Sequence, residues 1–324
     1  MKTFTFSVLA FNHGEWILEH LESIGYLIKR YRPPVVDLIV SDDGSRDRTR
    51  SLIDEWLLAN SDLFRGVTKL YNNENIGTVA CVKNIVEACK TKVLKITAGD
   101  DVYSFEDIFY YSSRYNDASI VSGLPYMLIN GSLKNDTISN VMHIASSLIY
   151  LERHRFDMPH ATNAPNLLYN FPQLRETMKS PLLGNVKLVE DLAIQVVLTD
   201  NDYSFKQLYV AFVYYRRTLS SAYLIRGSQV DLDQKEIMRF QISRSSWLIK
   251  MLLKNRYFCY GIKNKLLKYL INLPFYIFLF KSLANASNIY QRLSSFTDAR
   301  KLVLHQMHYK RIVESAGRCA DAIE

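Results

Sequence analysis

Two pairs of aspartates, Asp42-Asp43 and Asp100-Asp101, each follow a short apolar run of the sequence. Hard divalent cations such as Mg²⁺ and Mn²⁺ prefer oxygen ligands and often share one or two carboxylates with the phosphates of a substrate. Asp100-Asp101 therefore suits a metal that neutralises a diphosphate. Because Gly-Asp-Asp is also favourable turn chemistry, a solvated loop is the alternative interpretation.

The Asp42-Asp43 pair is open to two interpretations as well. A carboxylate here can accept the imide N–H of a uracil ring, or it can cap the helix that follows. Ser45 and Asp47 are better spaced to cap that helix. We therefore expect Asp43 to remain available for a ligand.

A third acidic pair, Glu190-Asp191, lies in an otherwise apolar run over residues 186–198. Buried charges without partners are costly, so the pair needs a partner or a purpose. General-base catalysis on an acceptor hydroxyl is one purpose, because neighbouring acids raise each other's pKa toward useful values. An acidic pair at a helix N-terminus is the alternative.

Alternating strands and helices must position these carboxylates. Apolar runs predict strands at residues 4–11, 35–40, 67–71 and 93–97, and helical spacing predicts helices at 15–30, 47–58 and 78–89. Repeated alternation implies right-handed βαβ units and a mostly parallel sheet. Ligands bind beyond the carboxyl ends of such strands, which is where both aspartate pairs fall.

Beyond Tyr103 the periodicity is weaker. We expect a helix at residues 105–115, an extended segment at 119–124, a loop at 157–170, a helix from Asp191 onward and a late strand at 209–215. From about residue 228 the chain has a helical and basic character.

Charge is distributed unevenly along the chain. Of the net +8, residues 1–205 contribute −5 and residues 206–324 contribute +13. Such a basic segment can face nucleic acid or an anionic membrane. The apolar window at 266–280 is shorter than the roughly 20 residues of a membrane span, so we expect an interfacial helix flanked by lysines. A helical unit packed on the rest of the chain or on a second subunit is the alternative.

Composition narrows the class of protein. Hydrophobic residues make up 48% and charged residues 22% of the 324 residues, which is typical of a folded globular chain. Four cysteines without CxxC spacing favour a reducing cytosol, and the apolar run at 4–11 is too short for an export signal. No two glycines lie two residues apart, so the GxGxxG fingerprint of dehydrogenases is missing.

Five short motifs, taken in order, resemble those of the family 2 glycosyltransferases over about two-thirds of the chain. The motifs are Ser7-Val8-Leu9-Ala10-Phe11-Asn12, Val40-Ser41-Asp42-Asp43-Gly44-Ser45-Arg46-Asp47, Asn72-Asn73-Glu74-Asn75-Ile76-Gly77 with Lys83-Asn84, Ala98-Gly99-Asp100-Asp101, and Glu190-Asp191 with Tyr215-Arg216-Arg217. The resemblance implies a GT-A fold, a nucleoside-diphosphate sugar donor, Mg²⁺ or Mn²⁺, and inversion at the anomeric carbon.

Carried over by position, the resemblance implies a role for each motif on the donor side. Phe11 and Asp43 would hold the nucleobase, and Lys83 would lie near the nucleotide. The neighbouring Asn12 and Asp42 are assigned to the same nucleotide-sugar site.

The remaining motifs would carry the chemistry. Asp101 would bind the metal, and Asp100 would bind the ribose or the sugar of the donor. Asp191 would be the general base, with Glu190 as the alternative.

One position departs from the family pattern. Many members carry a His two residues after the Tyr-Arg pair, where it helps to hold the metal or the diphosphate, and Thr218 stands in that area here. Arg216 or Arg217 can supply that contact as a cationic clamp on phosphate. The Gln-x-x-Arg-Trp segment of processive members is missing, so we expect addition of a single sugar.

We therefore expect an α/β, GT-A-type, mostly parallel twisted sheet flanked by helices. A catalytic domain would span residues 1–222, with a nucleotide-binding half at 1–101 and an acceptor-side half at 102–222, followed by a basic helical region at 223–324. The expected donor is UDP-linked, and the expected acceptor is a hydroxyl of a glycan or lipid-linked glycan in bacterial-type surface polysaccharide synthesis. We expect a cytoplasmic protein, peripheral on the membrane or homo-oligomeric, that does not bind nucleic acid. The alternatives are a non-catalytic scaffold, a nucleotide-binding module and a sugar nucleotidyltransferase.

Overall fold

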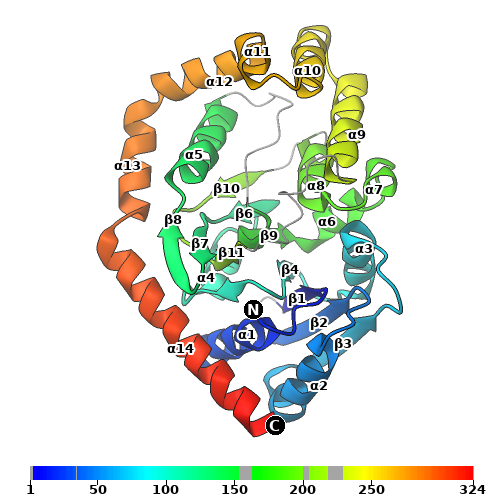
Figure 1. Cartoon of the computed structure of the whole chain (residues 1–324), viewed down its shortest axis with the longest axis vertical. Coiled ribbons are helices and arrows are strands. Elements are labelled where there is room, and N and C mark those ends of the chain that lie inside the picture. The colour runs from blue at the N-terminus through cyan, green and yellow to red at the C-terminus, as the bar shows by residue number, and fades with distance from the viewer. Residues whose placement is uncertain (1–2, 34, 153–162, 200–203, 218–228, 324) are drawn as a thin grey trace.

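Two sheets organise the chain in the computed structural model, which describes residues 3–33, 35–152, 163–199, 204–217 and 229–323. The larger sheet has seven strands in the order β10-β6-β9-β4-β1-β2-β3, and the smaller has four in the order β5-β11-β7-β8. Helices flank the sheets, and the C-terminal helices form an arc around one side of the molecule (Figure 1).

The first half of the chain forms the parallel strands that the sequence predicts. The elements are β1 (Phe4–Ala10), α1 (Ile17–Tyr31), β2 (Val36–Asp42), α2 (Thr49–Asn60), β3 (Gly66–Tyr71), α3 (Thr78–Ala88) and β4 (Val93–Ala98). Each predicted boundary lies within two residues of the observed one. In α1 the predicted apolar face is buried through Ile17, Leu21 and Ile24, because residues three and four apart share one side of a helix.

The larger sheet is completed by β6 (Ile120–Ser122), β9 (Leu167–Asn170) and β10 (Phe205–Gln207). The expectation of a loop at 157–170 is wrong for 167–170, because β9 runs antiparallel between β4 and β6. Leu167 and Leu168 are buried there. Residues 157–162 of that loop lie outside the described residues.

The smaller sheet brings distant segments together. It contains β5 (Val102–Tyr103), β7 (Tyr126–Ile129), β8 (Ser132–Asn135) and β11 (Val213–Arg216). Only the second half of the predicted strand at 209–215 forms β11. Its antiparallel register with β5 pairs Tyr214 with Val102, which places Arg216 beside the turn that carries Asp100 and Asp101.

Five helices lie between residues 108 and 199 in the described part of the chain. They are α4 (Ile108–Arg114), α5 (Thr137–Glu152), α6 (Phe171–Thr177), α7 (Leu182–Asn185) and α8 (Glu190–Thr199). The sequence predicted α4 and α8, but it gave no specific signal for α5.

The basic C-terminal segment is helical, as predicted. It forms α9 (Gln229–Arg244), α10 (Trp247–Tyr260), α11 (Lys265–Leu270), α12 (Leu273–Ala284), α13 (Ala286–Phe296) and α14 (Ala299–Ile323). Helix α9 packs on α7 and α8, α13 on α5, and α14 on α1 and β8 (Figure 1). The predicted boundary at 222/223 lies outside the described residues. Among the residues described, no helix is long and apolar enough to cross a membrane.

The C-terminal helices also contribute to the hydrophobic core. Phe296, Tyr309 and Ile312 are buried with Val102 and Tyr214 of the smaller sheet. The Phe296 ring stacks on the Tyr126 ring, with the ring centroids 4.7 Å apart and an interplanar angle of 17°. The segment is therefore part of the folding unit that carries the sheets.

We predict that Phe296→Ala lowers the free energy of unfolding by about 3–5 kcal/mol, because it removes a buried aromatic ring and leaves a cavity. Tyr290→Ala on the same helix is the matched control, since Tyr290 is 73% exposed and should change stability by no more than about 0.5 kcal/mol. Denaturant unfolding monitors both. Equal stability of the two variants would show that the segment folds apart from the sheets.

Candidate active site

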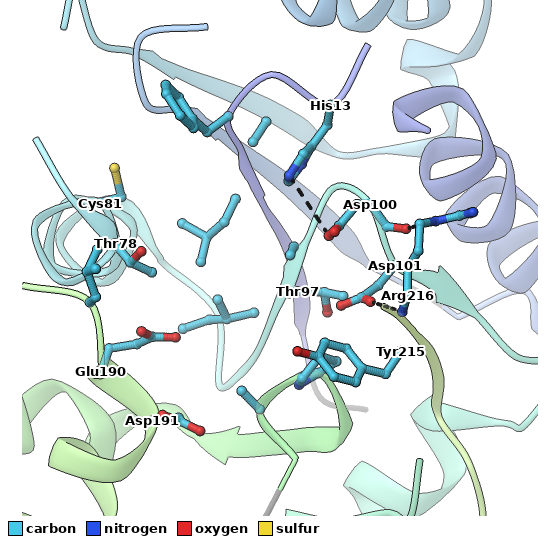
Figure 2. A pocket seen from close by; sticks show the side chains of 18 of the residues that line it. His13, Thr78, Cys81, Thr97, Asp100, Asp101, Glu190, Asp191, Tyr215 and Arg216 are labelled. Atoms are coloured by element: carbon cyan, nitrogen blue, oxygen red, sulfur yellow. Dashed lines mark hydrogen bonds and ion pairs between the residues drawn. The ribbon is translucent and has the colours of Figure 1, made fainter. Parts of the chain in front are cut away.

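A cavity of about 830 Å³ opens at the carboxyl ends of β1, β2 and β4, a size typical of small-molecule sites. Figure 2 shows Asp101 and Tyr215 on one side of it and Glu190 and Asp191 on another. All of the predicted site residues line this cavity except Asp42 and Lys83. Those that line it are Phe11, Asn12, Asp43, Asp100, Asp101, Glu190, Asp191, Arg216 and Arg217.

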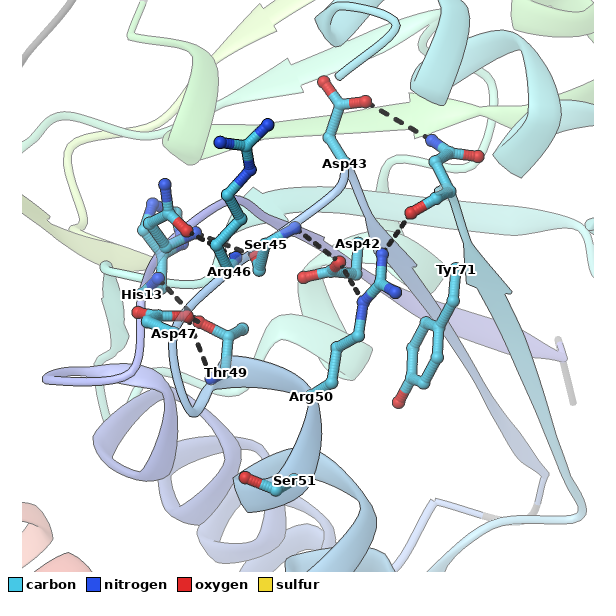
Figure 3. Close-up of polar contacts among 12 residues, drawn as sticks. His13, Asp42, Asp43, Ser45, Arg46, Asp47, Thr49, Arg50, Ser51 and Tyr71 are labelled. Carbon is cyan, nitrogen blue, oxygen red and sulfur yellow. Dashed lines mark hydrogen bonds and ion pairs between the residues drawn. The ribbon is translucent and has the colours of Figure 1, made fainter. Parts of the chain in front are cut away.

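The loops after β1 and β2 are tied to each other (Figure 3). The Asn12 N–H donates to Ser45 Oγ at 2.8 Å, and Asn12 Oδ1 accepts from the Arg46 N–H at 2.9 Å. Farther along, Asp47 Oδ2 accepts from the Gly14 N–H at 2.9 Å. These bonds hold the 43%-exposed ring of Phe11 at the cavity.

The two members of the Asp42-Asp43 pair face different surroundings. The Asp42 carboxylate is fully buried and accepts hydrogen bonds from Arg50 Nε at 2.5 Å and from the Ser45 N–H at 3.0 Å. Its Oδ2 is buried without a hydrogen-bond partner. Asp42 does not line the cavity, because it ends a strand, where successive side chains point to opposite faces. Its expected contact with the nucleotide-sugar stays a prediction.

Asp43 lines the cavity and also fixes the loop after β3. Its Oδ1 accepts from the Ile76 N–H at 2.7 Å, and its Oδ2 accepts from the Gly77 N–H at 3.0 Å. The loop lies so close that a Cβ at Gly44 (φ +81°) would be 2.6 Å from the Glu74 carbonyl carbon. Oδ2 still has acceptor capacity for a ligand.

Lys83 lies half-exposed on α3 and does not line the cavity. Its expected place near the nucleotide stays a prediction. Two other residues of the same helix, Thr78 and Cys81, do line it.

Asp101 is fully buried, and its two oxygens differ. Oδ1 accepts from the Arg216 N–H at 2.8 Å, whereas Oδ2 is buried with no hydrogen-bond partner. Burial and the neighbouring charge of Asp100 raise the pKa of Asp101 well above its ordinary value. Such an oxygen is costly in isolation and is well suited to a cation.

A buried lysine lies near Asp101. Lys95 Nζ donates to Thr97 Oγ1 at 2.9 Å and to the Pro165 carbonyl at 2.5 Å. Burial lowers the pKa of Lys95 to about 7. Thr97 Oγ1 in turn lies 2.8 Å from the Tyr103 hydroxyl, so a polar network supports the turn that carries the two aspartates.

The remaining predicted residues of this wall differ in how far they are engaged. Asp100 Oδ1 lies 4.0 Å from His13 Nε2. His13 was not among the predicted site residues, because no sequence pattern distinguishes it. The Arg216 side chain binds Glu19 Oε2 at 2.5 Å and the Asp100 carbonyl at 2.6 Å. Arg217 is exposed at the cavity. Of the two arginines, Arg217 is therefore the better placed to contact a ligand. Thr218 lies outside the described residues.

Glu190 and Asp191 begin α8, as predicted for an acidic pair at a helix N-terminus, and they also line the cavity. Burial, followed by the charge of Asp191, raises the pKa of Glu190 to about 8. Burial also raises the pKa of Asp191 above its ordinary value. Both carboxyl groups are therefore shifted toward their protonated forms, and both line the cavity.

Sequence reasoning missed Asp233, which holds the loop before this pair. Its buried Oδ2 accepts from the N–H groups of Lys187 at 2.9 Å, Leu188 at 2.6 Å and Val189 at 3.3 Å. The Lys187 carbonyl accepts from the Val79 N–H at 3.0 Å, which joins the loop to α3. A signal existed in the sequence, because Val230, Asp233 and Ile237 fall on one buried helical face.

Within the described residues, no group of three or more His, Cys, Asp or Glu side chains is arranged to hold a metal. The unpartnered Oδ2 of Asp101 nevertheless fits a hard cation that takes its other ligands from phosphates and water. This chemistry matches an ion that is bound together with its substrate.

Residues 5–145 match the model of glycosyl transferase family 2. Uncharacterized proteins of Mycobacterium tuberculosis and Mycobacterium bovis are 31% identical over 96 residues, which is 30% of this chain and 26% of each relative. The chain thus spans about a quarter of the length of these relatives.

Solved structures share the fold. TarS residues 1–349 of S. aureus in complex with UDP-GlcNAc has a TM-score of 0.54 at 15% identity, covering 98% of this chain and 92% of that one. A mannosyltransferase from Pyrobaculum calidifontis in complex with GDP-Man and Mn²⁺ has a TM-score of 0.55 at 14% identity, covering 97% and 87%. The predicted GT-A fold is confirmed.

We predict that Asp233→Ala frees the loop before Glu190, because three buried N–H groups lose their acceptor. Amide hydrogen exchange at residues 187–189 should become at least about tenfold faster, with a loss of about 3 kcal/mol in the free energy of unfolding. Glu236→Gln on the same helix is the control, since its ion pair with Arg239 is exposed and is worth little. Unchanged exchange at 187–189 in Asp233→Ala would contradict this role.

Proposed function

We propose that this chain, whose residues 5–145 match the model of glycosyl transferase family 2, is a glycosyltransferase that transfers a single sugar from a UDP-sugar to an acceptor hydroxyl with inversion. The observation that carries the proposal is the arrangement of carboxylates in the cavity. The unpartnered Oδ2 of Asp101 lies on one wall, and the Glu190-Asp191 pair lies across from it (Figure 2).

The nucleobase would bind between Phe11 and Asp43. The exposed Phe11 ring offers a stacking surface, and Asp43 Oδ2 has acceptor capacity for the imide N–H of uracil. A solved relative in fold, TarS, binds UDP-GlcNAc, which supports a UDP-linked donor here.

The diphosphate would lie between Asp101 and Arg217. A divalent ion, Mg²⁺ or Mn²⁺, would be held by Asp101 and would supply charge stabilisation for the departing diphosphate. The mannosyltransferase that shares the fold was solved with Mn²⁺. Arg217, exposed at the cavity, adds a cationic contact to phosphate, and Asp100 beside it would bind the ribose or the sugar.

Asp191 would act as the general base. In a single inverting displacement, the acceptor hydroxyl attacks the anomeric carbon from the face opposite the diphosphate and loses its proton as the bond forms. Asp101 cannot accept this proton if its free oxygen binds the metal. Burial and the charge of Asp191 raise the pKa of Glu190 to about 8, which favours its protonated form, and we assign the proton-accepting role to Asp191 with Glu190 as the alternative.

The acceptor would approach along the wall formed by Tyr169, Tyr215 and the start of α5, which all line the cavity. We propose a glycan or lipid-linked glycan hydroxyl, as in bacterial-type surface polysaccharide synthesis. The basic segment 223–324 supports a peripheral position on the inner face of a membrane that presents such an acceptor.

A scaffold without catalytic activity is less consistent with these contacts. A buried carboxylate oxygen without a partner destabilises a fold that makes no use of it. Asp42 Oδ2 and Asp101 Oδ2 are both buried without a partner, but of these two residues Asp101 alone lines the cavity, where a bound cation would pair its free oxygen.

We predict that Asp191→Asn lowers turnover by about 10² to 10⁴-fold, the usual contribution of a positioned base. Donor binding should be unchanged, because the amide keeps the size of the side chain and lies away from Asp101. UDP release in a transfer assay measures turnover, and calorimetry with UDP measures binding.

The control for Asp191→Asn is Glu190→Gln, which mimics the protonated form of Glu190 and should retain most activity near pH 7. In the wild type, turnover should fall with decreasing pH once Asp191 takes up a proton. The fall should begin at a higher pH than for an ordinary aspartate, because burial raises the pKa of Asp191. An active Asp191→Asn with an inactive Glu190→Gln would move the role to Glu190.

Metal dependence supplies a separate prediction. Asp101→Asn should abolish the enhancement of UDP binding by Mn²⁺, because an amide oxygen carries no charge to hold the ion. The fold should persist, since the asparagine oxygen can still accept from the Arg216 N–H. Asp42→Asn is a useful comparison because Asp42 lies outside the cavity. Equal Mn²⁺ enhancement in wild type and Asp101→Asn would place the metal elsewhere.

A further inference from the structure

Helices α10, α11 and α12 carry a broad exposed apolar surface, which we call the α10–α12 face. Trp247 on α10 and Phe280 on α12 are each 75% exposed, and Leu266 on α11 is 71% exposed. In α12 only Pro274 is buried, although the helix is almost entirely apolar. Folded chains rarely leave this much apolar surface exposed unless a partner covers it.

The three helices form one surface rather than three separate ones. Helix α10 packs on both α11 and α12, and Figure 1 shows them together at the end of the molecule farthest from the C-terminus. The exposed side chains of the face therefore lie in one region.

The three helices themselves carry only positive charge. Residues 247–284 contain seven Lys and Arg residues and no Asp or Glu, although Asp231 of α9 accepts from the Tyr260 hydroxyl of α10 at 2.6 Å. Lys254 and Lys263 are exposed beside the apolar side chains, and Lys268 Nζ lies 5.1 Å from the centre of the Tyr260 ring. A partner must accept apolar side chains and also supply negative charge.

The need for both apolar contact and negative charge distinguishes three kinds of partner. A second copy of the chain that used the same face would bring seven cations against seven, with no acid in residues 247–284 of either copy to pair with them. A nucleic acid would pair with the cations but would leave Phe280 and Leu283 in water. An anionic lipid bilayer provides both negative headgroups and an apolar interior.

We infer that the α10–α12 face docks on an anionic lipid membrane and lies in its headgroup region without spanning it. The Leu273–Ala284 helix has 12 residues, whereas a span needs roughly 20. The sequence predicted one interfacial helix at 266–280. The structure divides this window between α11 and α12, because Asn272 caps the start of α12, and the face that we propose also includes α10.

The face is connected to the acceptor side of the cavity. Helix α12 packs on α5, whose residue Ser139 lines the cavity. Helix α10 packs on α9, which carries Asp233 and so contacts the loop before Glu190. Docking would therefore place the acceptor wall next to the bilayer, an orientation that rests on the proposed lipid-linked acceptor.

Vesicle flotation of the full chain tests the inference, using phosphatidylcholine vesicles with and without phosphatidylglycerol. Binding should require the anionic lipid at low salt and weaken at high salt. Lys254→Glu/Lys263→Glu should reduce the bound fraction by at least about tenfold, because four units of charge change at the surface. Phe280→Ser/Leu283→Ser should reduce it to a similar extent.

Two controls match these variants. Lys310→Glu/Arg318→Glu makes the same change in net charge at exposed positions of α14, and Leu58→Ser replaces an 86%-exposed leucine of α2. Both should float like the wild type. No binding to anionic vesicles, or equal loss of binding in the α14 control, would overturn the inference.

Sedimentation equilibrium and UDP release complete the test. A dimer that Phe280→Ser/Leu283→Ser dissociates would also overturn the inference, because it would show that a second copy covers the face. UDP release by donor hydrolysis, measured without vesicles, should be the same in all variants. Vesicle binding without any UDP release would leave the docking face in place and contradict the proposed function instead.

Discussion

The arrangement of the site depends on one buried carboxylate. Asp101 lies at the end of a turn after β4, where one of its oxygens accepts from the Arg216 backbone and the other has no partner. This geometry requires the antiparallel pairing of β5 with β11, two strands more than 100 residues apart in sequence. The smaller sheet thus completes a turn that the larger sheet begins, and Lys95 and Thr97 support it from within the protein.

The other parts of the site are brought to this turn by separate contacts. Asp43 fixes the loop after β3, and the Lys187 carbonyl joins that side of the cavity to the loop before α8. Asp233 holds the same loop from α9. The C-terminal segment therefore supports the loop before the Glu190-Asp191 pair, and it also carries the exposed α10–α12 face.

Local sequence patterns predicted the parts of the fold that local physics determines. The four parallel strands and the buried face of α1 followed from apolar periodicity, and the carboxyl ends of those strands located the cavity. The patterns did not reveal β9, because its burial comes from antiparallel pairing with two strands that are distant in sequence. The patterns did not show that the Asp42 carboxylate binds Arg50, because this contact is recognised only in three dimensions, and Asp233 was missed because its three donors lie more than 40 residues away.

In the proposed mechanism Asp101 would hold a divalent ion at the diphosphate while Asp191 faces the acceptor. Anomalous diffraction from crystals of the chain grown with UDP and Mn²⁺ would locate the ion. We expect a manganese peak within bonding distance of Asp101 Oδ2 and of the diphosphate, with uracil between Phe11 and Asp43 and no metal contact from Asp191. A peak at Glu190 and Asp191, or UDP bound outside this cavity, would contradict it.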